Sequence, residues 1–339
     1  MNPPLRISVA MTAYNGERFI RAQLESLAWQ TRLPNELVVS DDGSTDRTLE
    51  VVRHFAVGAP FSVRILTGSG NVGVSKNFER SIAACTGDII FPCDHDDVWL
   101  PNKILETAGV FDRYPSAGIV MSNSEVVSED LQPLGRKLYR HGFPRTERLY
   151  RGGVAAVRFV MGSQITAGHT MAFRAVPFLA GAIAALADGA PYDVICAILL
   201  ASLGDVVAIP GCLTRYRRHE GQVTPSSDLP SGSVGWLVRR LRGVLVDYEG
   251  TSALRARHAR SIRMMGARLR DLGAPADIVA FMNGKADIAA FQANLPSSRL
   301  RRLIPVLRNL FGGRYHRYAG GVLSAGRDLV IPAPRRLIR

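Results

Sequence analysis

The sequence predicts an α/β protein, with a mostly parallel, doubly wound sheet followed by an α-helical C-terminal region. Short apolar runs alternate with segments of helical spacing through the first hundred residues, which is typical of such a sheet. Polar, turn-forming loops follow the apolar runs, as expected where strands end. The last third is rich in arginine and leucine at helical spacing. At 339 residues, the chain is long enough for one large domain and an appendage.

Charge divides the chain into the same two parts. Residues 1–225 contain 22 basic and 22 acidic side chains, whereas residues 226–339 contain the whole formal net charge of +13. We therefore expect two regions, 1–225 and 226–339. No long uncharged apolar run and no secretory signal are present in the sequence. The four cysteines lack metal-type spacing, which favours a reduced, cytoplasmic setting.

The strands of the first half end in polar loops. Residues 7–11 (ISVAM) run into TAYNG, a helix follows over 19–29, and residues 36–40 (ELVVS) run into DDGSTDRT. A helix that Asp46 can cap comes next, and a third strand over 63–66 precedes the loop GNVGVSKN. Ligands of doubly wound sheets bind outside the carboxyl ends of the strands, so we expect these loops to meet at one site.

An acidic cluster follows the next apolar strand, in DIIFPCDHDDVW. Asp94, Asp96 and Asp97 would repel one another, so a cation is expected beside them. Oxygen ligands without a thiolate suit Mg²⁺ or Mn²⁺, which are often shared with the phosphates of a substrate. The alternative is an acidic, solvated turn without a ligand.

Four ordered motifs together resemble the nucleotide-sugar half of family-2 glycosyltransferases, which have the GT-A fold. They are ISVAMTAYNGERFI, ELVVSDDGSTDRT, GNVGVSKN and DHDDVWLPNKI. Their residues are most similar to those of the bacterial rhamnosyltransferase-like members. The resemblance covers residues 5 to about 225 and not the tail. It implies an inverting, Mn²⁺- or Mg²⁺-dependent transfer of rhamnose or another hexose from a nucleoside-diphosphate sugar. The implied acceptor is a glycan or a lipid-linked glycan in cell-surface polysaccharide synthesis.

The resemblance also implies which residues form the donor site. Thr12, Tyr14 and Asn15 would surround the nucleotide base, and Asp42 would hydrogen-bond its edge. The remaining donor and metal residues are Lys76 facing the nucleotide, Asp94 and Asp96 of the D-x-D with Asp96 as metal ligand, Gly168 near the sugar and diphosphate, Arg217, and His219 as a further metal or diphosphate contact. Structural alternatives exist for three of these: Asp42 as a turn former, Lys76 as a solvated lysine, and His219 as a packed histidine.

Asp193 is the expected catalytic base. The family has a Glu-Asp or His-Asp pair followed by an aromatic residue here, and the carboxylate takes the proton of the acceptor hydroxyl. This sequence has Tyr192 before Asp193 and Val194 after it, so two features of the pattern are missing. The alternative for Asp193 is a partner of the helix N-terminus. We expect His169 to be structural or on the acceptor side rather than a ligand.

Two further regions are predicted in less detail. We expect residues 120–158 to be strand and loop on the far side of the site. In the tail we expect helices over 234–248, 253–273, 277–295 and 298–313, followed by a basic end. They suit a helical bundle, an oligomer element or a segment in peripheral contact with anionic membrane. No nucleic-acid-binding motif accompanies the charge.

Two rival functions remain open from the sequence. One is a catalytically inactive nucleotide- or glycan-binding module, which the substitutions around Asp193 favour. The other is a nucleotidyltransferase with an Asp-rich metal site, although the expected Gly-rich triphosphate loop is missing near the first strand.

Overall fold

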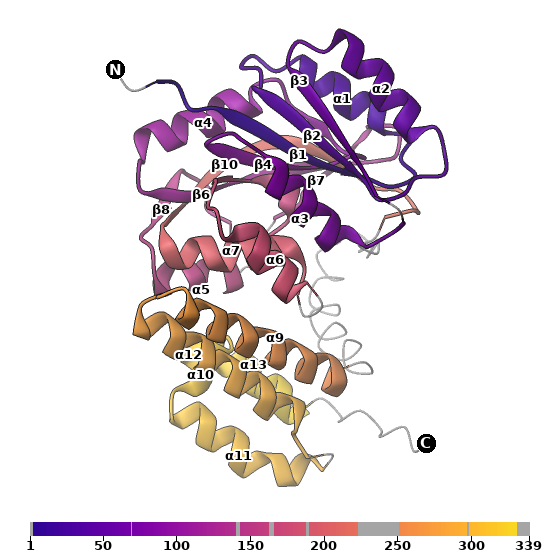
Figure 1. The fold of residues 1–339 in the computed structure, drawn as a ribbon. Coiled ribbons are helices and arrows are strands. Elements are labelled where there is room, and N and C mark those ends of the chain that lie inside the picture. Colours follow the sequence, from indigo (N-terminus) through magenta and orange to yellow (C-terminus); the bar gives the residue numbers. More distant parts are fainter. Residues whose placement is uncertain are drawn as a thin grey trace. The chain divides into compact units, whose positions relative to one another are not determined.

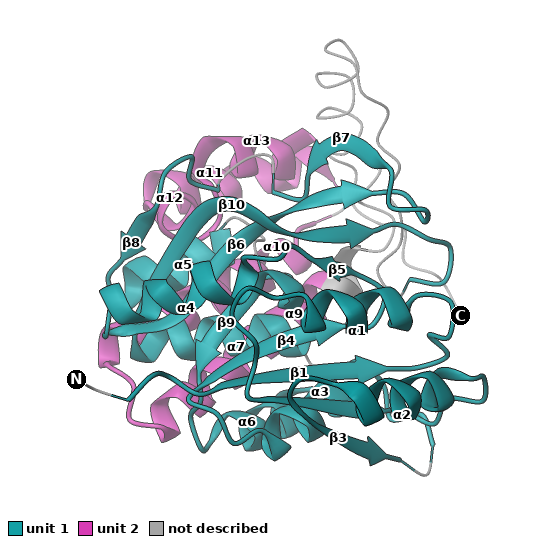
Figure 2. Ribbon diagram, turned by 90° about the horizontal axis from the view of Figure 1, so that it is seen from above, with its two compact units in different colours: residues 1–226 teal, residues 227–339 magenta. Residues whose placement is uncertain are grey.

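The computed structural model describes residues 3–68, 70–139, 143–162, 166–187, 190–222, 251–296 and 298–330. The chain forms two compact units, unit 1 over 1–226 and unit 2 over 227–339 (Figure 2). Each unit is described by itself below.

Unit 1 is built on one ten-stranded sheet, in the order β3-β2-β1-β4-β9-β6-β10-β5, with β7 beside β6 and β8 beside β10 (Figure 1). The strands are β1 (Ile7–Ala13), β2 (Glu36–Asp41), β3 (Ser62–Thr67), β4 (Ile89–Asp94), β5 (Val98–Trp99), β6 (Ala117–Val127), β7 (Pro133–Lys137), β8 (Arg148–Tyr150), β9 (Met171–Arg174) and β10 (Asp205–Arg217).

Strands β3, β2, β1 and β4 run parallel, as the alternating pattern predicts. The helices that connect or follow the strands of unit 1 are α1 (Ile20–Ala28), α2 (Thr48–Gly58), α3 (Val74–Ala84) and α4 (Lys103–Arg113). Thr12 near the end of β1 is in register with Ser40 of β2 and Asp94 of β4. The loops after these three strands therefore start from one edge of the sheet.

The other half of the sheet differs from a simple parallel arrangement. β9 lies between β4 and β6 and is antiparallel to both. The long strands β6 and β10 are parallel, and β5 pairs antiparallel with the end of β10, with Val98 opposite Arg215. This pairing brings the acidic loop beside the last residues of unit 1's final strand.

The remaining helices of unit 1 are α5 (Val154–Gly162), the 3₁₀ turn η1 (Gly168–Thr170), α6 (Leu179–Leu186) and α7 (Tyr192–Leu203). The expectation of strand and loop through residue 158 is wrong at its end, because residues 154–158 already belong to α5. Ala156, Val157 and Val160 are buried there at helical spacing, which a prediction based on the polar residues upstream misses.

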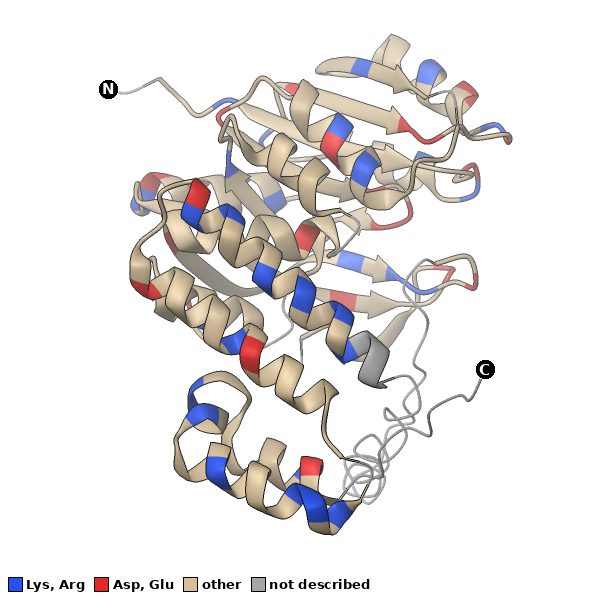
Figure 3. Ribbon diagram, turned by 60° about the horizontal axis from the view of Figure 1, so that its bottom comes forward, with Lys and Arg blue, Asp and Glu red and all other residues tan. Residues whose placement is uncertain are grey.

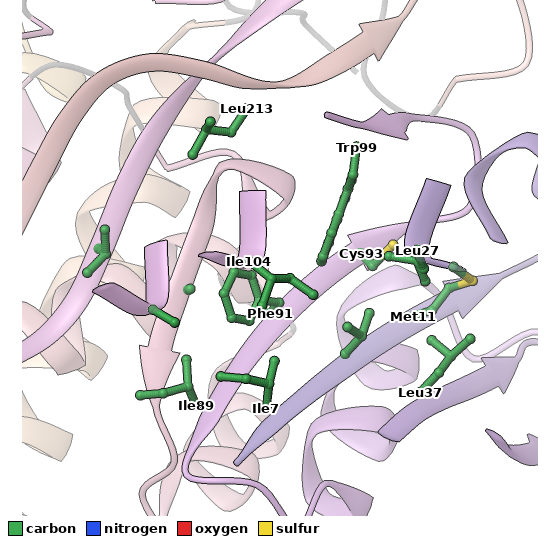
Figure 4. Close-up of a cluster of buried hydrophobic side chains, with 14 of the residues drawn as sticks. Ile7, Met11, Leu27, Leu37, Ile89, Phe91, Cys93, Trp99, Ile104 and Leu213 are labelled. Atoms are coloured by element: carbon green, nitrogen blue, oxygen red, sulfur yellow. The ribbon is translucent and has the colours of Figure 1, made fainter. Parts of the chain in front are cut away.

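The core of unit 1 lies between the sheet and its helices. Figure 4 shows part of it, with Ile7 and Met11 of β1 beside Phe91 and Cys93 of β4. These strand residues are fully buried, as are Leu24 and Leu27 of α1. A sheet buried in this way is rigid, and it fixes the starting points of the polar loops.

Unit 2 is helical over its described residues. Its elements are α9 (Thr251–Asp271), α10 (Ala276–Ala293), α11 (Arg299–Phe311), α12 (Arg314–Tyr318) and α13 (Gly321–Val330). Helices α9, α10 and α11 correspond to three of the predicted tail helices, whereas the one expected over 234–248 lies outside the described residues. Among the helices described in either unit, none has the length and apolar character needed to cross a membrane.

A buried polar network joins the helices of unit 2. Asp328 on α13 is fully buried and accepts hydrogen bonds from Tyr315 Oη at 2.7 Å, Gln292 Nε2 at 2.7 Å and Arg255 Nη1 at 3.3 Å. The backbone carbonyl of Asp328 accepts a bond from Arg302 Nη1 at 3.1 Å. Because the donors to the carboxylate come from three helices and Arg302 of a fourth binds the carbonyl, Asp328 fixes how the helices pack.

Candidate functional site

The acidic loop after β4 is held against the end of β10. Nε2 of His219 lies 3.0 Å from Oδ2 of Asp96. Arg217 donates its backbone N–H to Asp97 Oδ1 at 3.0 Å and its Nε to the Asp96 carbonyl at 2.7 Å. The Arg217 guanidinium also lies over the ring of Phe19, 4.8 Å from its centre. Arg217 thus orders the loop that carries the carboxylates.

Asp96 and Asp97 have opposite electrostatic environments. Burial alone would raise the pKa of Asp96, but the hydrogen bond from His219, together with the charges of His95 and His219, outweighs burial and lowers that pKa. Burial, with the charges of Asp96 and Asp94, raises the pKa of Asp97 well above its usual value. Asp96 is therefore the carboxylate that stays ionised most readily.

Asp94 and Asp97 of the same loop form a second group of possible ligands with His169. Nδ1 of His169 is 3.5 Å from Oδ2 of Asp97 and 3.7 Å from Oδ2 of Asp94. These three side chains could hold a metal ion. Oδ2 of Asp97 is buried and has no hydrogen-bond partner, and 34% of the Asp94 side chain is exposed. The other ring nitrogen of His169, Nε2, lies 3.1 Å from Ser124 Oγ, and the ring stacks on Tyr216, so the orientation of the imidazole is fixed.

Lys103 supplies a buried amine beside this group. Its Nζ donates to the His169 carbonyl and to Thr214 Oγ1, the latter at 2.7 Å, and lies 4.2 Å from the centre of the Trp99 ring. Burial lowers the pKa of Lys103 to about 7, although the charges of Cys93, Asp97 and Asp94 oppose this shift. With a pKa of about 7, the amine carries its positive charge in only part of the molecules near neutral pH.

The loops after β1 and β2 are tied to each other. Asn15 has φ of 45°, and its Oδ1 accepts the Thr45 N–H at 2.8 Å while its own N–H reaches Ser44 Oγ at 2.9 Å. Asp41 accepts the N–H groups of Gly43 and Ser44. A left-handed asparagine at this turn is favourable, because its short amide can bond to nearby backbone.

Asp42 binds the loop that follows β3. Its Oδ1 accepts the Val72 N–H and its Oδ2 the Gly73 N–H, both at 2.9 Å. The residue is buried, so its carboxylate also serves as an internal anchor for the GNVGVSKN segment. Each oxygen has a second lone pair, and a bond to a nucleotide base would have to use it.

The other predicted donor residues surround this edge. Thr12 is buried at the end of β1, whereas Tyr14 and Lys76 are exposed. A Cβ on Gly16 would come 2.2 Å from Cδ2 of His95, so the glycine lets the loop after β1 approach the acidic loop.

Asp193 lies in the first turn of α7, where it is half-buried beside the buried Tyr192. Its Oδ1 accepts the Val194 N–H at 2.8 Å. Burial raises the pKa of Asp193 to about 7, and the charge of Asp94 adds to the rise. Asp193 is therefore near enough to Asp94, at the end of β4, to be affected by its charge. A carboxylate with such a pKa is well matched to general-base chemistry near neutral pH.

Tyr192 occupies the position before the base. Its ring stacks on Phe78 with centres 3.8 Å apart, and its N–H donates to Ser75 Oγ at 3.2 Å. A Cβ on Gly168 would lie only 1.7 Å from Tyr192 Oη, so the tyrosine requires a glycine there. Gly168 is thus fixed by packing against α7 as well as by its place beside the site.

Asp97, His169 and Lys103 are the site residues that sequence reasoning missed or placed elsewhere. Asp97 and Lys103 lie within the quoted motif DHDDVWLPNK, but spacing alone does not show that both side chains turn inward. His169 lies in η1, which begins about 40 residues after the end of β6, so it is far in the sequence from the acidic loop that it contacts. The only sequence signal for this segment was the run of small residues around Gly168. Such a run predicts that the backbone comes close to a neighbouring group, but it does not identify His169 as a ligand.

The match to known proteins covers the part of the chain just described. The family profile described as Glycosyl transferase family 2 matches residues 8–171. This segment is a family 2 glycosyltransferase domain. The dTDP-rhamnosyl transferase RfbG of Shigella flexneri is 37% identical over 98 residues, 28% of this chain and 34% of RfbG. An uncharacterized protein of Mycobacterium tuberculosis, Rv1520, is 32% identical over 126 residues, 37% of this chain and 36% of that protein. The chain thus matches about a third of the length of these relatives.

Solved structures of S. aureus TarS have the same fold. The TarS 1–349 structure has a TM-score of 0.55 at 16% identity and covers 93% of this chain and 89% of TarS 1–349. Its complex with UDP-GlcNAc has a TM-score of 0.52 at 20% identity, with 93% and 90% covered. The predicted α/β fold of the GT-A type, followed by C-terminal helices, is confirmed.

Proposed function

We propose that this protein transfers a sugar from a nucleoside-diphosphate sugar to a glycan or lipid-linked acceptor, with inversion at the anomeric carbon. The observation that carries the proposal is the juxtaposition at the end of β4. There Asp96 pairs with His219, and the negative charge of Asp94 acts on Asp193. Family 2 membership of residues 8–171 supports the reaction class.

Asp96 and His219 fit a divalent metal. Two neighbouring ligands of an octahedral ion, each about 2.1 Å from it, are about 3 Å apart. The Asp96 and His219 ligand atoms are 3.0 Å apart, and the low pKa of Asp96 keeps it anionic. We favour this pair over the Asp94–Asp97–His169 group, because burial raises the pKa of Asp97 well above its usual value, and a protonated carboxyl is a poor metal ligand. When bound, Mn²⁺ or Mg²⁺ would neutralise negative charge on the diphosphate leaving group.

Asp193 is proposed to act as the general base. The acceptor hydroxyl attacks the anomeric carbon, the carbon–phosphate oxygen bond breaks, and the hydroxyl proton passes to the Asp193 carboxylate. The nucleoside diphosphate leaves with the bonding electron pair. Tyr192 and Gly168 would position this carboxylate, since they fix the start of α7. Thr12, Tyr14, Asn15, Asp42, Lys76 and Arg217 complete the proposed donor site.

The sugar and the acceptor are proposed by likeness alone. RfbG is named as a dTDP-rhamnosyl transferase, and TarS has been crystallised with UDP and UDP-GlcNAc. We propose a hexose donor, with dTDP-rhamnose as the first to test, and cell-surface polysaccharide synthesis as the setting. The basic region over 226–339 is proposed to hold the enzyme at the cytoplasmic face of a membrane, where a lipid-linked acceptor would be presented.

Binding and turnover together test the proposed function. A panel of nucleoside diphosphates and nucleotide sugars is screened by thermal shift with and without Mn²⁺; a ligand at about 100 times its Kd stabilises by about 2.7 kcal/mol. Nucleotide-sugar turnover is then assayed with the donors that bind. Binding with metal-dependent turnover supports the transferase, and binding without turnover under any condition supports the inactive module. Pyrophosphate release from a nucleoside triphosphate would instead support a nucleotidyltransferase.

A further inference from the structure

Helix α11 presents an apolar face to solvent and buries an arginine on the opposite side. Leu300, Ile304 and Phe311 are 86%, 77% and 84% exposed. At about 100° per residue, these three side chains lie within about 40° of one another around the helix. Arg302 and Val306, both fully buried, lie on the other side. The usual polarity of a surface helix is thus reversed.

The apolar face is fixed in this direction. Arg302 donates to the backbone carbonyls of Pro296 and Asp328, and Val306 packs in the core of unit 2 with Tyr315 and Ile288. Rotating α11 to bury Ile304 would turn Arg302 and Val306 toward solvent and leave the carbonyls of Pro296 and Asp328 without this donor. The lost hydrogen bonds and the exposure of Val306 make such a rotation unfavourable.

Arginines line one side of the apolar face. Arg301 and Arg308 are exposed and lie about 40–100° around the helix from its apolar side chains. Residues 298–330 contain seven arginines and one acid, Asp328, which is buried in the polar network. Figure 3 shows Lys and Arg along the helices of unit 2, with few Asp or Glu. An occupant of this face must therefore accept both apolar side chains and positive charge.

We propose that this face of α11 docks on the surface of an anionic lipid bilayer. Leu300, Ile304 and Phe311 would enter the boundary between headgroups and acyl chains, and Arg301 and Arg308 would contact lipid phosphates. A nucleic acid would leave the apolar side chains in water, and a neutral protein groove would leave the arginines unpaired. This proposal rests on the membrane contact proposed above and assigns it to one surface, but it does not depend on the reaction at the end of β4.

The test is flotation of the full-length protein with vesicles. The vesicles contain phosphatidylcholine alone or with about one third phosphatidylglycerol. Wild-type protein should float with the anionic vesicles at low salt and detach as salt rises, since about 0.1 M salt shortens the reach of charge to about 10 Å. The double variant Ile304→Ser/Phe311→Ser should lose binding by roughly tenfold or more for each side chain removed. Arg301→Gln/Arg308→Gln should also weaken binding and reduce its salt dependence.

Matched controls are available in unit 1. Val57→Ser removes a side chain that is 90% exposed on α2, and Arg53→Gln/Arg145→Gln removes two exposed charges; both should float as the wild type does. Sedimentation of each variant reports its oligomeric state. The proposal is wrong if wild-type protein stays at the bottom, if Ile304→Ser/Phe311→Ser floats unchanged, or if that variant instead dissociates a wild-type oligomer. The last result would make the face an interface between copies.

Discussion

Nε2 of His219 and Oδ2 of Asp96 lie 3.0 Å apart, although 123 residues separate them in the sequence. The pairing of β5 with β10 creates this contact, because it places the last residues of β10 beside the loop that follows β4. Arg217, two residues before His219, then binds the carbonyl of Asp96. The proposed metal pair is therefore formed by the sheet.

The first prediction concerns this pair. Asp96→Ala and His219→Ala should each weaken Mn²⁺-dependent binding of a nucleoside diphosphate by more than the roughly 10–100-fold typical of losing an outer-shell partner. Isothermal titration with and without Mn²⁺ measures the effect. Asp94→Ala should be milder, and Asp112→Ala, an exposed acid on α4, is the control. If His169→Ala abolished the metal effect while His219→Ala did not, the ion would belong to the Asp94–Asp97–His169 group.

The second prediction concerns the pH dependence of turnover. A base works only when deprotonated, and burial raises the pKa of Asp193 to about 7. The rate should therefore rise with pH up to about 7, by about tenfold per unit below that pKa, and then level off. A profile of kcat against pH at saturating donor measures this. A rate that is flat from pH 5 to 7 would be inconsistent with Asp193 as the base.

The third prediction replaces the base itself. Asp193→Asn keeps the size of the side chain but cannot accept a proton at neutral pH. We expect transfer to fall by roughly 10²–10⁴-fold with donor binding preserved, and the rise of rate with pH to vanish. Titration of the donor into the variant is the control for folding. Unchanged turnover would move the base to another residue, with His169 the next to test.

The fourth prediction concerns Gly168. In Gly168→Ala, the new Cβ would lie 1.7 Å from Tyr192 Oη, so Tyr192 and the start of α7 must shift. Overpacking of this kind costs about 1–3 kcal/mol. The midpoint temperature of thermal unfolding and kcat should both fall. Gly326→Ala is the control, because no atom lies within 4 Å of the new Cβ, and neither quantity should fall through a clash. Wild-type stability and rate in Gly168→Ala would show that Tyr192 can move away from the new Cβ without cost, which would contradict this prediction.

The fifth prediction concerns the stability of unit 2. Asp328→Ala leaves Arg255 without its buried carboxylate, and breaking a buried pair costs about 3–5 kcal/mol. The matched control is Asp287→Ala, an exposed acid that pairs with Arg263 at 2.7 Å and should cost about 1 kcal/mol or less. Hydrogen exchange in α10, α11 and α13 reports the loss directly. Equal exchange in the two variants would show that the network does not stabilise the unit.

Much of the fold follows from local patterns in the sequence. Apolar runs such as 7–11 and 36–40, which alternate with segments of helical spacing, predict buried strands, and parallel strands bring their polar loops to one edge. The loops after β1, β2 and β4 do meet there. The antiparallel insertion of β9 could not be foreseen in the same way, because strand order depends on long-range pairing.

The sequence predicts many of the residues that form the site, but not the contacts that their side chains make. The motif containing Asp96 indicates a cation, but nothing in its spacing reveals the inward turn of Asp97 or the buried amine of Lys103. Asp42 is a similar case. Its position in the motif predicts that it binds the nucleotide, but its carboxylate also accepts two backbone N–H groups of the protein. Side-chain direction at such positions is set by tertiary packing, which local sequence does not encode.

The most direct test of the proposed function is turnover of nucleotide sugars by the full-length protein with Mn²⁺, with EDTA, and in Asp96→Ala. We predict release of a nucleoside diphosphate from at least one donor, with dTDP-rhamnose tested first, only with the metal present and only when Asp96 is intact. Equal turnover with EDTA, or by Asp96→Ala at limiting Mn²⁺, would contradict the proposed metal pair.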